Sequence, residues 1–184
     1  VGFLIAILLI PMVYNFLPEH AKTRIDVFLN PELDPLGDGY NAIQSKIAVG
    51  AGMLFGTGFL EGSQTQYGYL PVQSSDFIFS VISEEMGFII SALVVILYLI
   101  LLLRILRTAS YAKDKYTSFV AVGIAGMFAF HFIENIGMSI GLLPITGVPL
   151  PFVSYGGSNL LTSGIAIGII LNISARKSQN VFFG

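Results

Sequence analysis

The stretch MGFIISALVVILYLILLL, residues 86–103, carries no charged residue and decides the fold class of this chain. A helix needs about 20 mostly apolar residues to cross the roughly 30 Å hydrocarbon core of a bilayer. Further runs without Asp, Glu, Lys or Arg cover residues 1–17, 116–133 and 160–175. The sequence therefore predicts an all-α, polytopic transmembrane helix bundle.

The composition of the whole chain points the same way. Of its 184 residues, 54% are hydrophobic and only 11% are charged. Soluble domains carry about 25% charged residues, so a soluble chain this poor in charge could not keep its surface hydrated. The chain contains no cysteine, which excludes disulfides and thiolate metal sites.

We predict a single membrane domain over residues 1–184. The first apolar run begins at residue 1 without an initiator methionine or a cleavage site, so we expect a helix cut at its N-terminal end. The chain is then the C-terminal half of a longer one. The predicted spans are residues 1–17, 47–60, 84–104, 116–138 and 159–175.

The predicted span over residues 47–60 is the weakest because it is short and contains four glycines, at positions 50, 52, 56 and 58. Each glycine costs a helix about 1 kcal/mol relative to alanine. Small residues at such spacing are typical of close helix contacts. We therefore expect this segment to pack inside the bundle and not to face lipid alone.

The orientation follows from the nine basic residues, which form three clusters. Cytoplasmic loops collect Lys and Arg, so we place all three clusters and the C-terminus on the cytoplasmic side. Residues 61–83 and 139–158 then form external loops, and the outer face carries no Lys or Arg. The clusters are Lys22, Arg24 and Lys46; Arg104, Arg107, Lys113 and Lys115; and Arg176 and Lys177.

Three acidic residues in or directly after the first external loop are candidates for function. Asp76 stands directly before the apolar run 77–82, where it could cap a helix or serve as a catalytic carboxylate, and the sequence leaves both interpretations open. Glu84 and Glu85 stand at the entrance of the next span. Their structural explanation is that a carboxylate is favourable near the start of a helix or at the membrane interface.

Three further polar residues lie near the predicted outer ends of the last spans. His131 and Glu134 share a helix face, but two residues make a poor metal site, so we expect them to hydrogen-bond each other. Ser154 lacks the glycine pattern of a nucleophile elbow and has no histidine at useful spacing. We expect it in a bend that the neighbouring glycines permit.

Three separated motifs give the chain a specific resemblance to a known family. NIGMSIGLLPITGVPLPFVSYGGS, residues 135–158, resembles the signature of the SEDS family (shape, elongation, division and sporulation). One departure is Asn159, where that signature usually has a small residue. DPLGDGYNAIQSK, residues 34–46, is similar to the rod-shape-determining members and not to the division members. The stretch from Leu70 to Phe79 resembles the external loop that carries the family's essential aspartate.

The resemblance implies a multi-pass protein of the bacterial cytoplasmic membrane, with ten helices of which this chain holds the last five. It implies a peptidoglycan glycosyltransferase that polymerises lipid II, the undecaprenyl-pyrophosphate-linked precursor, at the outer face during cell elongation. The implied partner is a class B penicillin-binding protein, a transpeptidase; no nucleic acid is expected. Asp76 becomes the expected catalytic residue, and the candidate substrate-binding residues are Gln73, Ser74, Ser75, Glu84 and Glu85.

The implied reaction is an inverting sugar transfer, which needs one general base on the acceptor hydroxyl and positive charge around the leaving pyrophosphate. With no base predicted on the outer face, that charge is expected from the missing half, from a divalent ion (Mg or Mn) or from helix N-termini. This chain alone is therefore expected to be inactive. The alternatives are a flippase for the lipid-linked precursor, which glycine-interrupted segments suit, and a non-catalytic scaffold for the transpeptidase.

Overall fold

The computed structural model describes residues 18–70 and 74–176, and within these ranges every regular element is a helix. The prediction of an all-α membrane bundle is confirmed, while the predicted span over residues 1–17 lies outside the described residues. The elements are α2 (Glu19–Leu29), the 3-10 helix η1 (Pro31–Leu33), α3 (Asp38–Ala51), α4 (Ser63–Gln66), α5 (Ile78–Ser110), α6 (Lys115–Ser139) and α7 (Gly157–Ala175).

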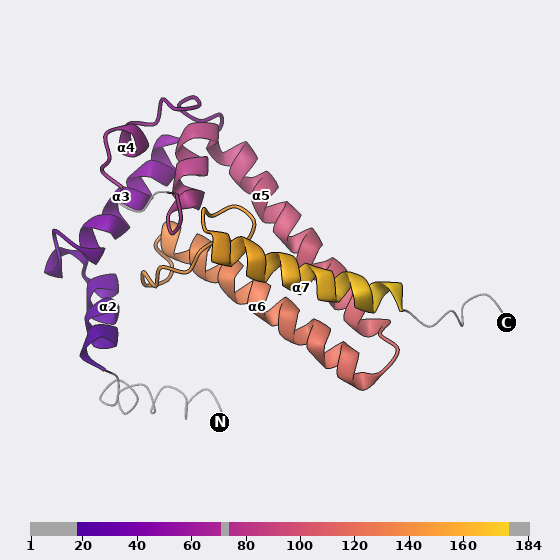
Figure 1. Ribbon diagram of the computed structural model, residues 1–184. Coiled ribbons are helices and arrows are strands. Elements are labelled where there is room, and N and C mark those ends of the chain that lie inside the picture. The colour runs from indigo at the N-terminus through magenta and orange to yellow at the C-terminus, as the bar shows by residue number, and fades with distance from the viewer. Residues whose placement is uncertain (1–17, 71–73, 177–184) are drawn as a thin grey trace, which may run out of the picture.

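Among the described residues, α5, α6 and α7 are long and apolar enough to cross a membrane. They contain the spans predicted at residues 84–104, 116–138 and 159–175. Figure 1 shows α5 and α6 as antiparallel neighbours, with α7 lying across both. The short helices α2, α3 and α4 gather at one end of this bundle, where α5 begins and α6 ends.

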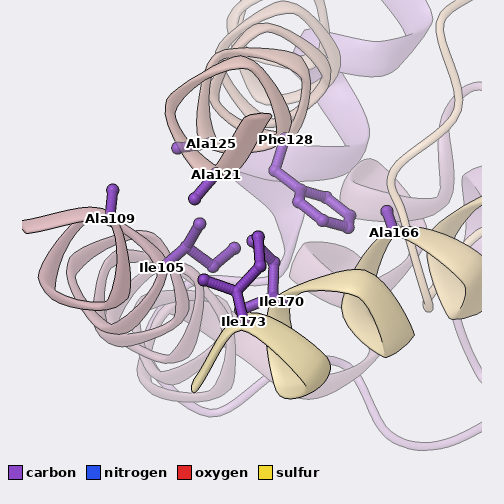
Figure 2. Close-up of a cluster of buried hydrophobic side chains, with 8 residues drawn as sticks. All are labelled: Ile105, Ala109, Ala121, Ala125, Phe128, Ala166, Ile170 and Ile173. Carbon is purple, nitrogen blue, oxygen red and sulfur yellow. The ribbon is translucent and has the colours of Figure 1, made fainter. Parts of the chain in front are cut away.

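A cluster of small and branched side chains joins the three long helices (Figure 2). α6 contributes two alanines, and their small side chains let neighbouring helices approach closely, as is common where helices pack in membranes. Phe128 fills the space that remains and is fully buried. The cluster comprises Ile105, Ala109, Ala121, Ala125, Phe128, Ala166, Ile170 and Ile173.

The prediction of one helix over residues 47–60 is wrong. Helix α3 ends at Ala51, and residues 52–60 form turns. Gly56 and Gly58 have φ angles of 83° and 115°, in the left-handed region that favours glycine. Gly52 packs so closely on the backbone of Ser83 that no Cβ would fit. The glycines therefore shape a tight loop against α5 and do not continue a helix.

This glycine loop fills a break in α5. The helix is interrupted at Gly87, which has φ 75° and ψ −176°. A broken helix is tolerated at membrane depth only where protein groups satisfy the freed backbone. The loop does so in both directions: Thr57 N and Gly58 N donate to the carbonyls of Glu84 and Glu85 (2.9 and 3.2 Å), and Phe88 N and Ile89 N donate to the carbonyls of Met53 and Leu54 (2.9 and 3.3 Å).

The three basic clusters do not lie at one end of the bundle, so that part of the orientation is wrong. Lys46 lies against Gly141, just beyond the C-terminal end of α6. Lys115 begins α6, and the 25 residues of that helix separate its two ends by roughly 36 Å. The predicted orientation requires a membrane crossing between Lys46 and residue 61. The glycine loop provides no crossing helix there, so Lys46 stays at the end that holds residues 139–158.

Candidate functional site

The site forms where the start of α5 meets the signature segment, residues 135–158. The carbonyls of three consecutive residues before α5 each accept a hydrogen bond from that segment. The donors are Tyr155 N to Ser74 O (2.7 Å), Ser154 Oγ to Ser75 O (2.5 Å) and Asn135 Nδ2 to Asp76 O (2.8 Å). The backbone that carries Asp76 is therefore fixed at every residue from 74 to 76.

The Asp76 carboxylate is half-buried, and its Oδ1 accepts a hydrogen bond of 2.7 Å from Ser75 Oγ. Its Oδ2 faces Gly147, where a Cβ would stand 3.1 Å away. The N-cap position of α5 is Phe77, and no side chain caps that helix. The interpretation of Asp76 as the cap of α5 is thus wrong.

Side chains of α6 hold the loop that faces Asp76. His131 Nδ1 donates to the Pro149 carbonyl (3.1 Å), and Glu134 Oε1 accepts from Thr146 Oγ1 (2.8 Å). The expected bond between His131 and Glu134 is replaced by these two contacts. Both residues lie on one helix face, and the loop folds back over that face and supplies a partner for each.

Asn135 is the positioning residue that the sequence reasoning missed. It is fully buried, and its amide donates a second bond of 2.8 Å to the Val148 carbonyl. One side chain thus ties the Asp76 backbone to the loop beside the carboxylate. A polar amide directly after Glu134 in an otherwise apolar helix was the signal that could have revealed it.

Ser154 lies in a bend, as predicted, and closes the same arrangement. Its Oγ accepts a hydrogen bond of 2.7 Å from Leu150 N while donating to Ser75 O. Phe152 within this turn has a positive φ of 63°. Ser154 is therefore a structural residue that couples the turn to the Asp76 segment.

Glu84 is fully buried and holds the short helix α4. Its Oε1 accepts from Gln64 N (2.7 Å), and its Oε2 accepts from Thr65 N (3.0 Å) and Thr65 Oγ1 (2.6 Å). Glu85 is also buried, Ser74 is exposed and Ser75 is half-buried. Gln73 lies outside the described residues. Of the candidate binding residues, Ser74 and Ser75 therefore lie beside Asp76, whereas Glu84 is occupied by the loop.

The Asp76 end of the bundle also carries positive charge, contrary to the expectation of an outer face without Lys or Arg. Lys22 pairs with Glu19 (3.1 Å), and Arg24 lies 3.9 Å from Asp38. Lys46 is exposed beside Gly141. That this chain alone is inactive stays a prediction.

The described residues do not form a metal site of their own, because no three His, Asp or Glu side chains lie close enough together to hold an ion. Asp76 and Glu134 approach the loop 146–148 from two elements, but they supply only two carboxylates.

Comparison with known proteins agrees with the geometry. A family model described as cell cycle protein (FtsW, RodA, SpoVE) matches residues 1–179. The peptidoglycan glycosyltransferase RodA of Treponema pallidum (strain Nichols) is 49% identical over 161 residues, covering 88% of this chain and 37% of that protein. Stage V sporulation protein E of Bacillus subtilis (strain 168) is 51% identical over 151 residues, covering 82% of this chain and 41% of that protein.

Among solved structures, a chain described in work on the structural coordination of polymerization and crosslinking by a peptidoglycan synthase complex superposes with a TM-score of 0.75. It is 29% identical, and the match covers 96% of this chain and 48% of that one. The chain thus spans less than half the length of these relatives. On the family match and these similarities, the chain belongs to the FtsW, RodA and SpoVE family of cell cycle proteins, the SEDS family.

Proposed function

We propose that the protein containing this chain is a peptidoglycan glycosyltransferase that polymerises lipid II at the outer face of the bacterial cytoplasmic membrane. Asp76 acts as its general base. The observation that carries this proposal is the fixing of three consecutive carbonyls, residues 74–76, by the signature segment. A catalytic group held in place before the substrate arrives avoids the cost of orienting it during the reaction.

The reaction is a single displacement. The acceptor sugar hydroxyl loses its proton to Asp76 Oδ2, and its oxygen attacks the anomeric carbon of the donor. The bond from that carbon to the pyrophosphate breaks, and the electron pair leaves with the polyprenyl pyrophosphate. Ser75 Oγ orients the other carboxylate oxygen. Gly147 leaves open the space in front of Oδ2 because it has no side chain.

The leaving pyrophosphate needs positive charge nearby. Lys46 is the exposed cation that we propose for this role from the present chain. A divalent ion (Mg or Mn) remains a separate proposal: such ions commonly use one or two protein carboxylates and substrate phosphates. Asp76 would be its ligand here, and the ion would supply additional charge compensation at the pyrophosphate.

The proposed setting is that of the rod-shape-determining members, with a class B penicillin-binding protein as the transpeptidase partner. The name of the RodA relative and the peptidoglycan synthase complex of the similar structure support it. The C-terminus is proposed to be cytoplasmic, because α7 ends near Arg176 at the end of the bundle where Arg104 and Arg107 lie.

A flippase is the second candidate, because the break in α5 at Gly87 resembles the interrupted helices of transporters. The glycine loop satisfies the backbone groups at this break, so it offers no free binding groups there. Asp76 lies before α5 begins, at the end of the bundle and not at its middle. Both observations favour the polymerase, which also explains the fixed carboxylate better than a silent scaffold does.

Polymerisation of lipid II by the full-length protein with its transpeptidase tests the proposal. Asp76→Asn keeps the size of the side chain but cannot accept the proton, and general-base catalysis contributes about 10²–10⁴ in rate. We expect the initial rate to fall by at least about a hundredfold with thermal stability unchanged. Asp114→Asn is the matched control, since Asp114 caps α6 at the opposite end and Asn caps about as well. An active Asp76→Asn protein would disprove the assignment.

A further inference from the structure

A groove of about 630 Å³ lies between α5 and α7, at the end of the bundle opposite Asp76. Its walls are apolar, and Ile105 and Ile170 of the core (Figure 2) contribute to them. Polar side chains stand toward the helix ends that border it. The apolar lining is Leu101, Ile105, Ile167, Ile170 and Leu171, and the polar lining is Arg104, Arg107, Thr108, Tyr111 and Ser174.

The two arginines of this groove lack a carboxylate partner within the described part of the chain. Arg104 and Arg107 lie on one face of α5, and both are exposed. The ion pairs in that part of the chain involve α2 and α3 instead. Between Glu85 and Glu134 the only acidic residue is Asp114, whose carboxylate accepts the Thr117 N–H as the cap of α6. The groove therefore combines apolar walls with two positive charges that no carboxylate of residues 18–70 or 74–176 compensates.

The depth of the groove fits the boundary between hydrocarbon and headgroups. Arg104 directly follows the charge-free stretch 86–103, and Arg107 lies 5.9 Å from the ring centroid of Tyr111. Arg and Tyr are side chains that commonly anchor helices at this boundary. Basic grooves between transmembrane helices on the cytoplasmic side are suited to anionic lipid headgroups.

We propose that this groove binds an anionic glycerophospholipid of the adjacent leaflet. The phosphate contacts the guanidinium groups of Arg104 and Arg107, and the hydroxyls of Thr108 and Ser174 provide additional donors. The parts of the acyl chains nearest the headgroup lie against Ile167 and Leu171. Guanidinium–phosphate contacts are charge-assisted and often bidentate, so the lipid supplies the anion that the groove lacks.

A helix from the remainder of the protein is a less suitable occupant. Unless that helix brought its own carboxylates, it would bury two guanidinium groups without partners, which costs several kcal/mol each. A soluble anion would satisfy the arginines but leave the apolar walls unused. A phospholipid satisfies both parts of the groove, which is why we choose it.

The test uses the full-length protein in detergent, with native mass spectrometry to count retained lipids. Phosphatidylglycerol should be retained in preference to phosphatidylethanolamine. The double variant Arg104→Gln, Arg107→Gln should bind phosphatidylglycerol about tenfold more weakly or worse, because each basic residue near the membrane surface contributes to the attraction. Arg176→Gln is the matched control: it removes a charge at the same end but does not line the groove.

A second variant, Ser174→Phe, fills the groove without changing the charge and should also reduce retention. Melting temperatures of all variants, measured without added lipid, show whether they are folded. The proposal is overturned if the folded double variant retains phosphatidylglycerol like the wild type, if both lipids are retained equally, or if Arg176→Gln loses as much. Displacement by a lower concentration of a polyprenyl phosphate would also overturn it, in favour of a precursor lipid. Counting retained lipids does not require glycan synthesis, so its result is independent of whether Asp76 is the general base.

Discussion

The side-chain amide of Asn135 on α6 donates a hydrogen bond of 2.8 Å to the backbone carbonyl of Asp76, 59 residues earlier in the chain. The same amide donates to Val148, in the loop beside the carboxylate. One buried side chain therefore sets the distance between the proposed base and the loop that faces it. The activity should depend on this residue although it does not touch the reacting atoms.

Replacing Asn135 with Ala should lower both stability and activity. The substitution leaves two carbonyls without their donor, and a buried polar group without a partner costs about 1–3 kcal/mol. We expect a lower melting temperature and a lower initial rate of lipid II polymerisation. Asn172→Ala, at an exposed position of α7, should change neither. An Asn135→Ala protein with wild-type activity would show that this bond does not position Asp76.

Adding a methyl group at position 147 should impair catalysis. Gly147 has a φ of 72°, and the Cβ of Gly147→Ala would stand 3.1 Å from Asp76 Oδ2. The variant combines backbone strain with crowding in front of the proposed base. The polymerisation rate is the measurement. Gly164→Ala is the control, because that glycine lies in α7 with nothing within 4 Å of the added carbon. It should retain full activity and gain some helix stability.

Neutralising Glu84 should loosen the loop that contains α4. The carboxylate accepts three hydrogen bonds from residues 64 and 65, and bonds to a charged group contribute about 1.5–3 kcal/mol each. In Glu84→Gln the amide nitrogen must face one of these donors. Amide hydrogen exchange over residues 63–66 should therefore accelerate. Glu32→Gln, at an exposed site, should leave this exchange unchanged; acceleration in both variants would refute a specific role for Glu84.

Single cysteines in a cysteine-free background of the full-length protein test the revised orientation. Cysteines replacing Lys46 and Ser63 should both react with an impermeant thiol reagent added to whole cells. A cysteine replacing Lys113, at the opposite end of the bundle, should react only after permeabilisation. Protection of the Lys46 position in whole cells would restore the original assignment, with that residue on the cytoplasmic side.

The long apolar runs were sufficient to predict α5, α6 and α7, because an apolar segment of that length is expected to form a membrane-spanning helix. The segment 47–60 was misassigned, since Gly56 and Gly58 adopt left-handed conformations and the loop around them hydrogen-bonds to residues 84–89 of α5. No local pattern reveals such partners. The position of Lys46 was misjudged for the same reason, because counting charges presupposes that each connecting segment crosses the membrane.

The site was predictable in part. Asp76 was identified through its resemblance to a family motif, whereas spacing alone left capping and catalysis open. The contacts of His131, Glu134 and Asn135 could not be predicted, since they depend on the path of a proline-rich loop that returns over α6. Local spacing shows which side chains share a helix face and does not show which loop covers it.

Gly87 also divides α5 into an N-terminal part, residues 78–86, and a C-terminal part, residues 88–110. The N-terminal part, with the glycine loop and the Asp76 segment, is tied to α3 and α6: Ser45 Oγ donates a hydrogen bond to Ser139 O and accepts one from Ser80 Oγ (2.7 Å each). In the C-terminal part, residues 88–110, more than half of the residues are exposed in this chain. A span answers a change in bilayer thickness by tilting. Because Gly87 interrupts the helix, we expect a tilt of the C-terminal part to disturb the segment that carries the Asp76 carboxylate less than a tilt of an unbroken helix would.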